Sequence, residues 1–175
     1  GWQKYGGISR YFYELAQNIA TLEGVDVRVV SPLYVNEYLA KSGFPVGGIR
    51  APQIRRTGRI YRALNQLLVP SALRRFNPDI IHETYYSFHG AAPKHSRVVI
   101  TVHDMIHELF PESFSSWDKT SSEKAAAARR ADHIICVSEN TRKDLIRLLD
   151  IDPVKTSVVY HGFELLAPPS GGRHV

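Results

Sequence analysis

A histidine and an aspartate stand directly after an apolar stretch near the middle of the chain, in the sequence VVITVHDMIHE from Val98 to Glu108. A near-continuous run of apolar, β-branched residues is typical of a buried parallel strand. Ligands of open α/β sheets bind just beyond the carboxyl ends of such strands. We therefore predict His103 and Asp104 as catalytic residues that hydrogen-bond a polar substrate or transfer a proton.

His103 has two other interpretations. The string HDMIH places His103 and His107 four residues apart, as in the zinc motif HExxH, but that motif lies on a helix and uses a glutamate as the base. Here the first histidine ends a strand and the acid is aspartate, so we predict no metal site. A purely structural histidine at a strand end remains open beside the active-site interpretation.

A glycine pair, Gly6–Gly7, precedes a helical pattern and is followed by Arg10. Glycines let the backbone approach a phosphate closely, and a helix N-terminus offers free N–H groups with a partial positive charge. Arginine adds a fork suited to phosphate oxygens. We predict a phosphate site here, with a tight turn and a surface arginine as the alternative. The pattern is not GxGxxG, and no Walker loop or GxSxG elbow is present.

Polar residues also follow two other predicted strands. Glu83 and Tyr85 come after the strand DIIH, and Ser138 and Glu139 come after HIICV. Each pair alone is typical of a loop or a helix cap. Their common position after successive strands places them along one sheet edge, so we predict them as substrate-binding residues.

Periodicity predicts the elements that hold these residues. Apolar spacing predicts helices, and short apolar or alternating runs predict strands. Alternating helices and strands indicate an α/β fold with a Rossmann-like, doubly wound parallel sheet. The predicted helices are 8–22, 59–69 (ended or kinked by Pro70), 116–131 and 138–149, and the predicted strands are 25–30, 79–82, 97–102, 133–137 and 155–160, with 33–57 irregular.

Composition narrows the class of protein. Of 175 residues, 43% are hydrophobic, enough for a folded core rather than a disordered chain. The single cysteine, Cys136, excludes a disulfide within the chain and favours a cytoplasmic protein. Its apolar neighbours predict a core residue rather than a nucleophile. No apolar run approaches the ~18 residues of a membrane span.

Basic charge is concentrated in one segment. Residues 38–78 hold eight lysines and arginines and no acid, which leaves 14 basic against 17 acidic residues in the rest of the chain. The predicted helix 59–69 carries an apolar stripe of Ile60, Leu64, Leu67 and Leu68. The stripe either packs on the sheet or contacts an anionic membrane surface through residues 50–75. We predict no nucleic-acid binding, because no recognised module is present.

Five ordered segments resemble the amino-terminal half of a family-4 glycosyltransferase of the GT-B fold. They span Tyr5 to Glu164 and read YGGISRYFYELA, RRFNPDIIHETYY, VVITVHDMIHELFPE, ARRADHIICVSENTRKDL and KTSVVYHGFE. The resemblance implies a retaining transfer of a sugar from a nucleotide diphosphate sugar to a glycan or lipid-linked acceptor. It further implies surface polysaccharide synthesis at the inner face of the membrane, with no cofactor beyond the donor substrate.

The resemblance also implies roles for individual residues. Gly6 and Gly7 would lie near the donor diphosphate, and His103 would face the donor sugar. His161–Gly162 matches the crossing to the second domain of that family. The acceptor side would be lined by Glu83, Tyr85, Ser138 and Glu139.

The same resemblance sets an expectation for domain organisation. We expect residues 1–166 to form the amino-terminal Rossmann-like domain without its first strand, and residues 167–175 to be a linker or tail. No glutamate is followed by another at the E-x7-E spacing of the donor domain. We therefore expect that domain to be missing and the chain alone to be inactive. A non-catalytic sugar-binding or scaffolding module is the alternative.

Overall fold

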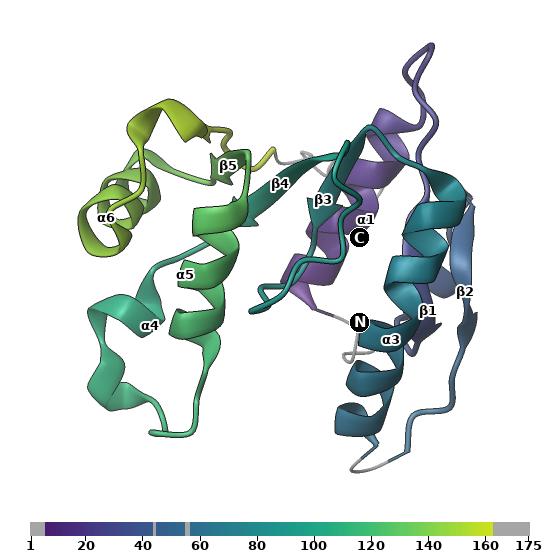
Figure 1. The fold of residues 1–175 in the computed structure, drawn as a ribbon, viewed down its shortest axis with the longest axis horizontal. Coiled ribbons are helices and arrows are strands. Elements are labelled where there is room, and N and C mark those ends of the chain that lie inside the picture. The colour runs from purple at the N-terminus through teal and green to yellow at the C-terminus, as the bar shows by residue number, and fades with distance from the viewer. Residues whose placement is uncertain (1–5, 44, 55–56, 163–175) are drawn as a thin grey trace, which may run out of the picture.

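Parallel strands build two sheets in the computed structural model, which describes residues 6–43, 45–54 and 57–162 (Figure 1). Strands β1 (Val29–Tyr34) and β2 (Val46–Arg50) form a two-stranded sheet. Four further strands form a second sheet in the order β3-β4-β5-β6. Their bounds are Ile80–Glu83, Arg97–Val102, His133–Cys136 and Thr156–Val158. The predicted tail 167–175 lies outside the described residues.

Helices alternate with these strands, which makes the domain a Rossmann-like α/β structure as predicted. In Figure 1, helices α1 and α3 lie to one side of β4, and α4, α5 and α6 lie to the other. Two short 3-10 turns cover Pro111–Ser113 and Pro153–Lys155. The helices are α1 (Gly7–Ile19), α2 (Glu37–Ala40), α3 (Gly58–Phe76), α4 (Ile106–Leu109), α5 (Thr120–Arg130) and α6 (Glu139–Leu149).

The core lies between the four-stranded sheet and helices α5 and α6. Ile100 and Val102 of β4 and Ile134 and Cys136 of β5 are almost fully buried. Alanines 127 and 128 of α5 and Leu145 of α6 cover them. Cys136 is a core residue, as predicted, and burial raises its pKa to about 11. Small side chains on α5 let this helix approach the sheet closely.

Two predictions in the first third of the chain are wrong. The strand predicted at 25–30 begins at Val29 and extends to Tyr34, and the predicted irregular region 33–57 contains α2 and β2. The register of β1 against β2 shifts between Val30 and Leu33, which interrupts the alternation of side chains between the two faces of the strand. Gly48 permits this bulge, because a Cβ at that position would lie 1.8 Å from the carbonyl oxygen of Ser31.

The basic helix is longer than predicted and continues through Pro70 to Phe76. Asn77, in the left-handed conformation at φ 53°, ends it. Asn65 fixes the helix to β1: its side-chain amide donates to the carbonyl of Leu33 at 2.9 Å and its Oδ1 accepts from the Leu33 N–H at 2.7 Å. These two bonds to the backbone of β1 hold α3 in place, although Pro70 has no N–H group to donate within the helix.

The apolar stripe of α3 does not pack on the sheet. Its members are all exposed, up to 74% for Leu67, while Leu73 is buried. The interpretation in which the stripe covers the sheet is therefore wrong, because the face that carries Asn65 makes that contact instead. Among the described residues, no helix is long and apolar enough to cross a membrane. The stripe consists of Ile60, Leu64, Leu67 and Leu68.

Candidate functional site

His103 lies in a cluster of rings at the carboxyl edge of the four-stranded sheet. Its imidazole stacks on His161, which follows β6, with ring centroids 5.7 Å apart and planes inclined by 12°. Tyr11 of α1 meets both imidazoles edge-on, each at 5.1 Å. Phe12 of the same helix lies edge-on to His103 at 6.1 Å. Residues 150 positions apart in the sequence thus share one site.

A threonine joins the cluster to a second histidine. Thr101 and His103 lie two residues apart, so the extended chain directs both toward the same side of the sheet. The Nε2 atom of His82 lies 2.9 Å from the hydroxyl of Thr101, and the hydroxyl of Tyr11 lies 3.3 Å from the same atom. Phe12 meets the His82 ring edge-on at 5.1 Å. A polar network therefore runs from β3 through β4 to α1.

The environment keeps both partly buried imidazoles neutral at pH 7. Burial, with a smaller contribution from nearby His103, lowers the pKa of His82 to about 4. Burial and His161 also lower the pKa of His103, and Asp104 partly opposes them. The Nε2 atom of His103 is buried and has no hydrogen-bond partner within the described residues. A neutral imidazole with a free nitrogen can exchange a hydrogen bond or a proton with a substrate hydroxyl.

The amino-terminal end of α1 starts one helical turn before Tyr11. Gly6 is the N-cap residue and brings no side-chain cap, and the first turn contains no acidic residue. The first intrahelical bond of the helix runs from the N–H of Arg10 to Gly6, which leaves the earlier N–H groups available to an anion. Among the described residues, a Cβ on Gly7 would meet nothing within 4 Å.

The model of Glycosyltransferase Family 4 matches residues 5–165. The chain belongs to this family. No curated protein matches it. The match spans the ring cluster, the uncapped start of α1 and both sheets, so it covers all the elements that carry the predicted site residues in this glycosyltransferase-family domain.

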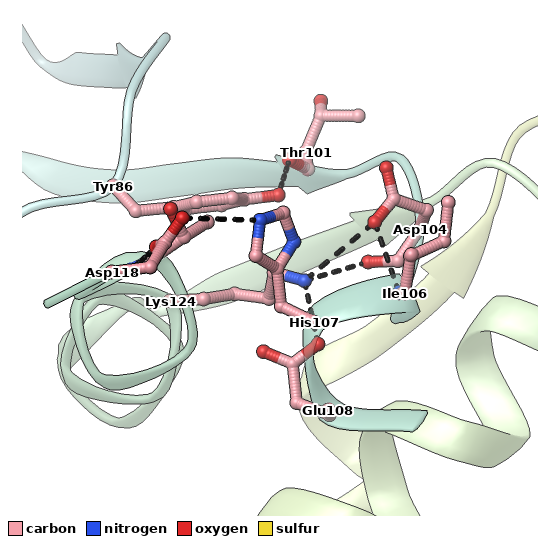
Figure 2. A network of polar contacts seen from close by, with 9 residues as sticks. Tyr86, Thr101, Asp104, Ile106, His107, Glu108, Asp118 and Lys124 are labelled. Carbon is pink, nitrogen blue, oxygen red and sulfur yellow. Dashed lines mark hydrogen bonds and ion pairs between the residues drawn. The ribbon is translucent and has the colours of Figure 1, made fainter. Parts of the chain in front are cut away.

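The carboxylate of Asp104 in this family-4 domain is directed toward Lys124 of α5 (Figure 2). Its Oδ1 atom accepts from the N–H of Ile106 at 3.1 Å and lies 3.8 Å from the ammonium of Lys124. Lys124 also donates to the backbone carbonyl of Asp104 at 2.9 Å. Asp104 therefore fixes the turn after β4, and the carboxylate stays half-exposed.

Lys124 is the central residue of this second network, and sequence reasoning missed it. Its ammonium lies 2.7 Å from Glu108, and the two side chains are only 2% and 4% exposed. The ammonium also lies 5.7 Å from the ring centre of Tyr86, whose hydroxyl donates to the carbonyl of Thr101. An alanine-rich helix gives no sequence signal for a buried lysine, because its partners come from α4 and the end of β4.

The four residues predicted for the acceptor side have other contacts. Glu83 is the last residue of β3 and pairs with Arg130 of α5. Ser138 is the N-cap of α6, as predicted, and its hydroxyl accepts from the N–H of Thr141 at 3.1 Å. Tyr85 and Glu139 are exposed. Among the residues that the structure describes, no hydrogen bond or ion pair joins these four to the ring cluster, and their acceptor role stays a prediction.

The predicted phosphate-site arginine and the zinc-like string occupy separate places. Arg10 is exposed, and its guanidinium lies 3.6 Å from Glu14, one turn further along α1, so its role at the phosphate site stays a prediction. His107 lies on α4 and stacks on Phe114 with centroids 3.9 Å apart. Within the described ranges, no group of three or more His, Cys, Asp and Glu side chains could hold a metal ion.

Replacing Lys124 by methionine is expected to destabilise the fold by about 3–5 kcal/mol, because it leaves Glu108 buried without its partner. Adding Glu108→Leu is expected to restore most of the loss, since an apolar pair of similar volume avoids the buried charge. Urea unfolding measures both free energies. Lys143→Met, at an exposed position on α6, is the control. A Lys124→Met variant as stable as this control would contradict the assigned role.

His82 is expected to make stability depend on pH between about 6.5 and about 4. In this window the unfolded chain binds a proton that folded His82 does not, so stability decreases as pH falls, by roughly 3 kcal/mol in all. Urea unfolding at several pH values measures the slope. His82→Gln should flatten it, whereas His95→Gln at an exposed position should not. Parallel curves for wild type and His82→Gln would contradict the lowered pKa.

Proposed function

We propose that this domain is the acceptor-side half of a retaining glycosyltransferase. The proposed reaction moves a sugar from a nucleotide diphosphate sugar to a glycan or lipid-linked acceptor in surface polysaccharide synthesis. The observation that carries the proposal is the buried Nε2 atom of His103, which has no partner among the described residues and whose ring packs on Tyr11, one turn after the uncapped start of α1. A sugar hydroxyl suits the imidazole, and a diphosphate suits the helix start.

The neutral state of His103 supports a role toward the donor sugar. A neutral imidazole accepts or donates one hydrogen bond and does not compete with the helix start for the diphosphate charge. Stacking on His161 and edge contacts with Tyr11 fix the orientation of the ring. A fixed donor or acceptor stabilises developing charge without reorganisation. The leaving diphosphate would be held by the N–H groups at Gly6–Gly7 and by Arg10.

His103→Ala in the full-length gene product is expected to lower nucleotide diphosphate release by roughly a hundredfold, as for a lost acid–base or charge-stabilising group. Release is measured over a panel of UDP- and GDP-sugars. The matched control is His95→Ala, an exposed histidine that precedes β4 whereas His103 follows it, and it should leave the rate unchanged. Equal rates for both variants, or no release from any donor by folded protein, would favour the non-catalytic binding module.

We further propose that residues 50–75 contact an anionic membrane surface at the cytoplasmic face. The exposed stripe of α3 supports this proposal, because Leu67 and its neighbours present apolar area beside Arg74 and Arg75 near the end of the same helix. Amphipathic helices with basic residues bind membrane surfaces by burying apolar side chains and attracting anionic lipid. Arg62 contributes less, since it already pairs with Glu123.

Replacing Arg74 and Arg75 together by glutamine is expected to weaken binding to vesicles that contain phosphatidylglycerol by roughly thirtyfold, at about 1 kcal/mol for each arginine. Leu67→Glu should weaken it as well. Co-sedimentation measures binding, with phosphatidylcholine vesicles as the neutral reference. Val154→Glu, at an 86% exposed position outside α3, is the control. Binding that is indifferent to anionic lipid would contradict the proposal.

A further inference from the structure

A cavity of about 330 Å³ lies on the other side of the sheet edge, between the segment after β4 and helices α5 and α6. It is separate from the ring cluster, because none of the cluster residues lines it. Its polar walls come from α4, from the loop before α5 and from the first turn of α5. Its apolar side comes from the end of α6. The residues used below are His107, Glu108, Phe114, Asp118, Ser121 and Leu148.

Two buried polar atoms of the lining residues have no partner in the part of the chain that the structure describes. They are Oε1 of Glu108 and Nδ1 of His107. The Glu108 side chain is only 4% exposed, and its other oxygen is held by Lys124, so the carboxylate cannot turn freely (Figure 2). A buried acceptor without a partner costs free energy until a ligand or water satisfies it. These atoms therefore favour a ligand with hydrogen-bond donors.

The charge around the cavity is negative. Lys124 already pairs with Glu108 and lies near Asp104. Asp118 adds a further carboxylate: its Oδ1 accepts from the N–H of Thr120 at 2.7 Å, and its Oδ2 lies 3.8 Å from Nε2 of His107. The hydrogen bonds with Thr120 lower the pKa of Asp118, so it stays ionised. A cationic ligand is attracted here and an anionic one is repelled.

Flat and apolar surfaces complete the site. The stacked rings of His107 and Phe114 form one wall, and Leu148 forms part of another. Trp117, directly before Asp118 in the chain, is 87% exposed, which leaves a large aromatic face free beside the cavity segment. Sites for small molecules combine apolar walls with a few fixed polar groups. A sugar ring offers both an apolar C–H face and several hydroxyl donors.

We propose that this cavity binds a sugar ring that carries a protonated amine, and that it excludes phosphorylated sugars. Its ammonium would lie against Asp118, and a hydroxyl would donate to Oε1 of Glu108. Ser121 lines the same space, and its hydroxyl would supply a further contact. The assignment of this ring as the acceptor rests on the proposed transferase function, whereas the binding itself does not.

The test measures binding of three probes to the full-length gene product: glucosamine, glucose and glucose 6-phosphate. Saturation-transfer NMR and tryptophan fluorescence report binding, the latter through Trp117. The expected order of affinity is glucosamine, then glucose, with no binding of glucose 6-phosphate. Asp118→Asn keeps the oxygen that caps Thr120 but removes the charge, and should weaken glucosamine binding roughly fivefold or more while glucose changes little.

Asp152→Asn is the matched control, because Asp152 accepts from the N–H of Val154 in a similar turn and does not line the cavity. It should leave all three affinities unchanged. Ser121→Phe fills the cavity and should abolish binding of glucosamine and glucose. Equal binding of the three probes, or equal effects of Asp118→Asn and Asp152→Asn, would overturn the proposal.

The nucleotide-release assay separates this inference from the proposed function. Nucleotide release that depends on His103, together with equal binding of glucosamine and glucose 6-phosphate, would support the transferase proposal and overturn the cavity proposal. Glucosamine binding that depends on Asp118, without release from any donor, would support the cavity and overturn the transferase.

Discussion

The buried ion pair between Lys124 and Glu108 is the interaction on which the arrangement of the sheet edge depends. An ammonium taken out of water must be matched by charge and hydrogen bonds, or the fold does not form around it. Here Glu108 matches its charge, and the carbonyl of Asp104 accepts a further bond. These contacts join the end of β4, the short helix α4 and helix α5. They fix the direction that the chain takes directly after His103.

That direction divides the edge into two unlike environments. Alternation along the extended chain sends Thr101 and His103 toward α1, while Ile100 and Val102 enter the core under α5 and α6. The chain then turns at Asp104 toward Lys124. One side of β4 thus ends in neutral imidazoles and aromatic rings, and the other ends in carboxylates beside a cavity. The short segment from Ile100 to Asp104 therefore contributes residues to both environments.

Sequence predicted the parts of the fold that local patterns determine. The strand at 97–102 and the cap at Ser138 are correct because a buried apolar run and a hydroxyl before a helix are local signals. The shift of β1 and the length of α3 depend on partners elsewhere, namely Gly48 and the backbone of Leu33. For the site, His103 was predicted from its place after a strand, but its contacts with Tyr11 and His161 arise only from the fold.

Regions that favour anions and regions that repel them lie at different places in the domain, so two substrates could be distinguished by their charge. The uncapped helix start at Gly6–Gly7 and the basic helix α3 favour anions, whereas the cavity beside Glu108 and Asp118 disfavours them. A transferase must keep its anionic donor out of the acceptor site. Repulsion between the donor phosphates and the carboxylates beside the cavity would achieve this without a steric barrier. The buried Lys124 does not weaken this discrimination, because Glu108 and Asp104 already surround its charge. In the proposed enzyme, the same ion pair that shapes the edge would therefore also keep the acceptor side negative.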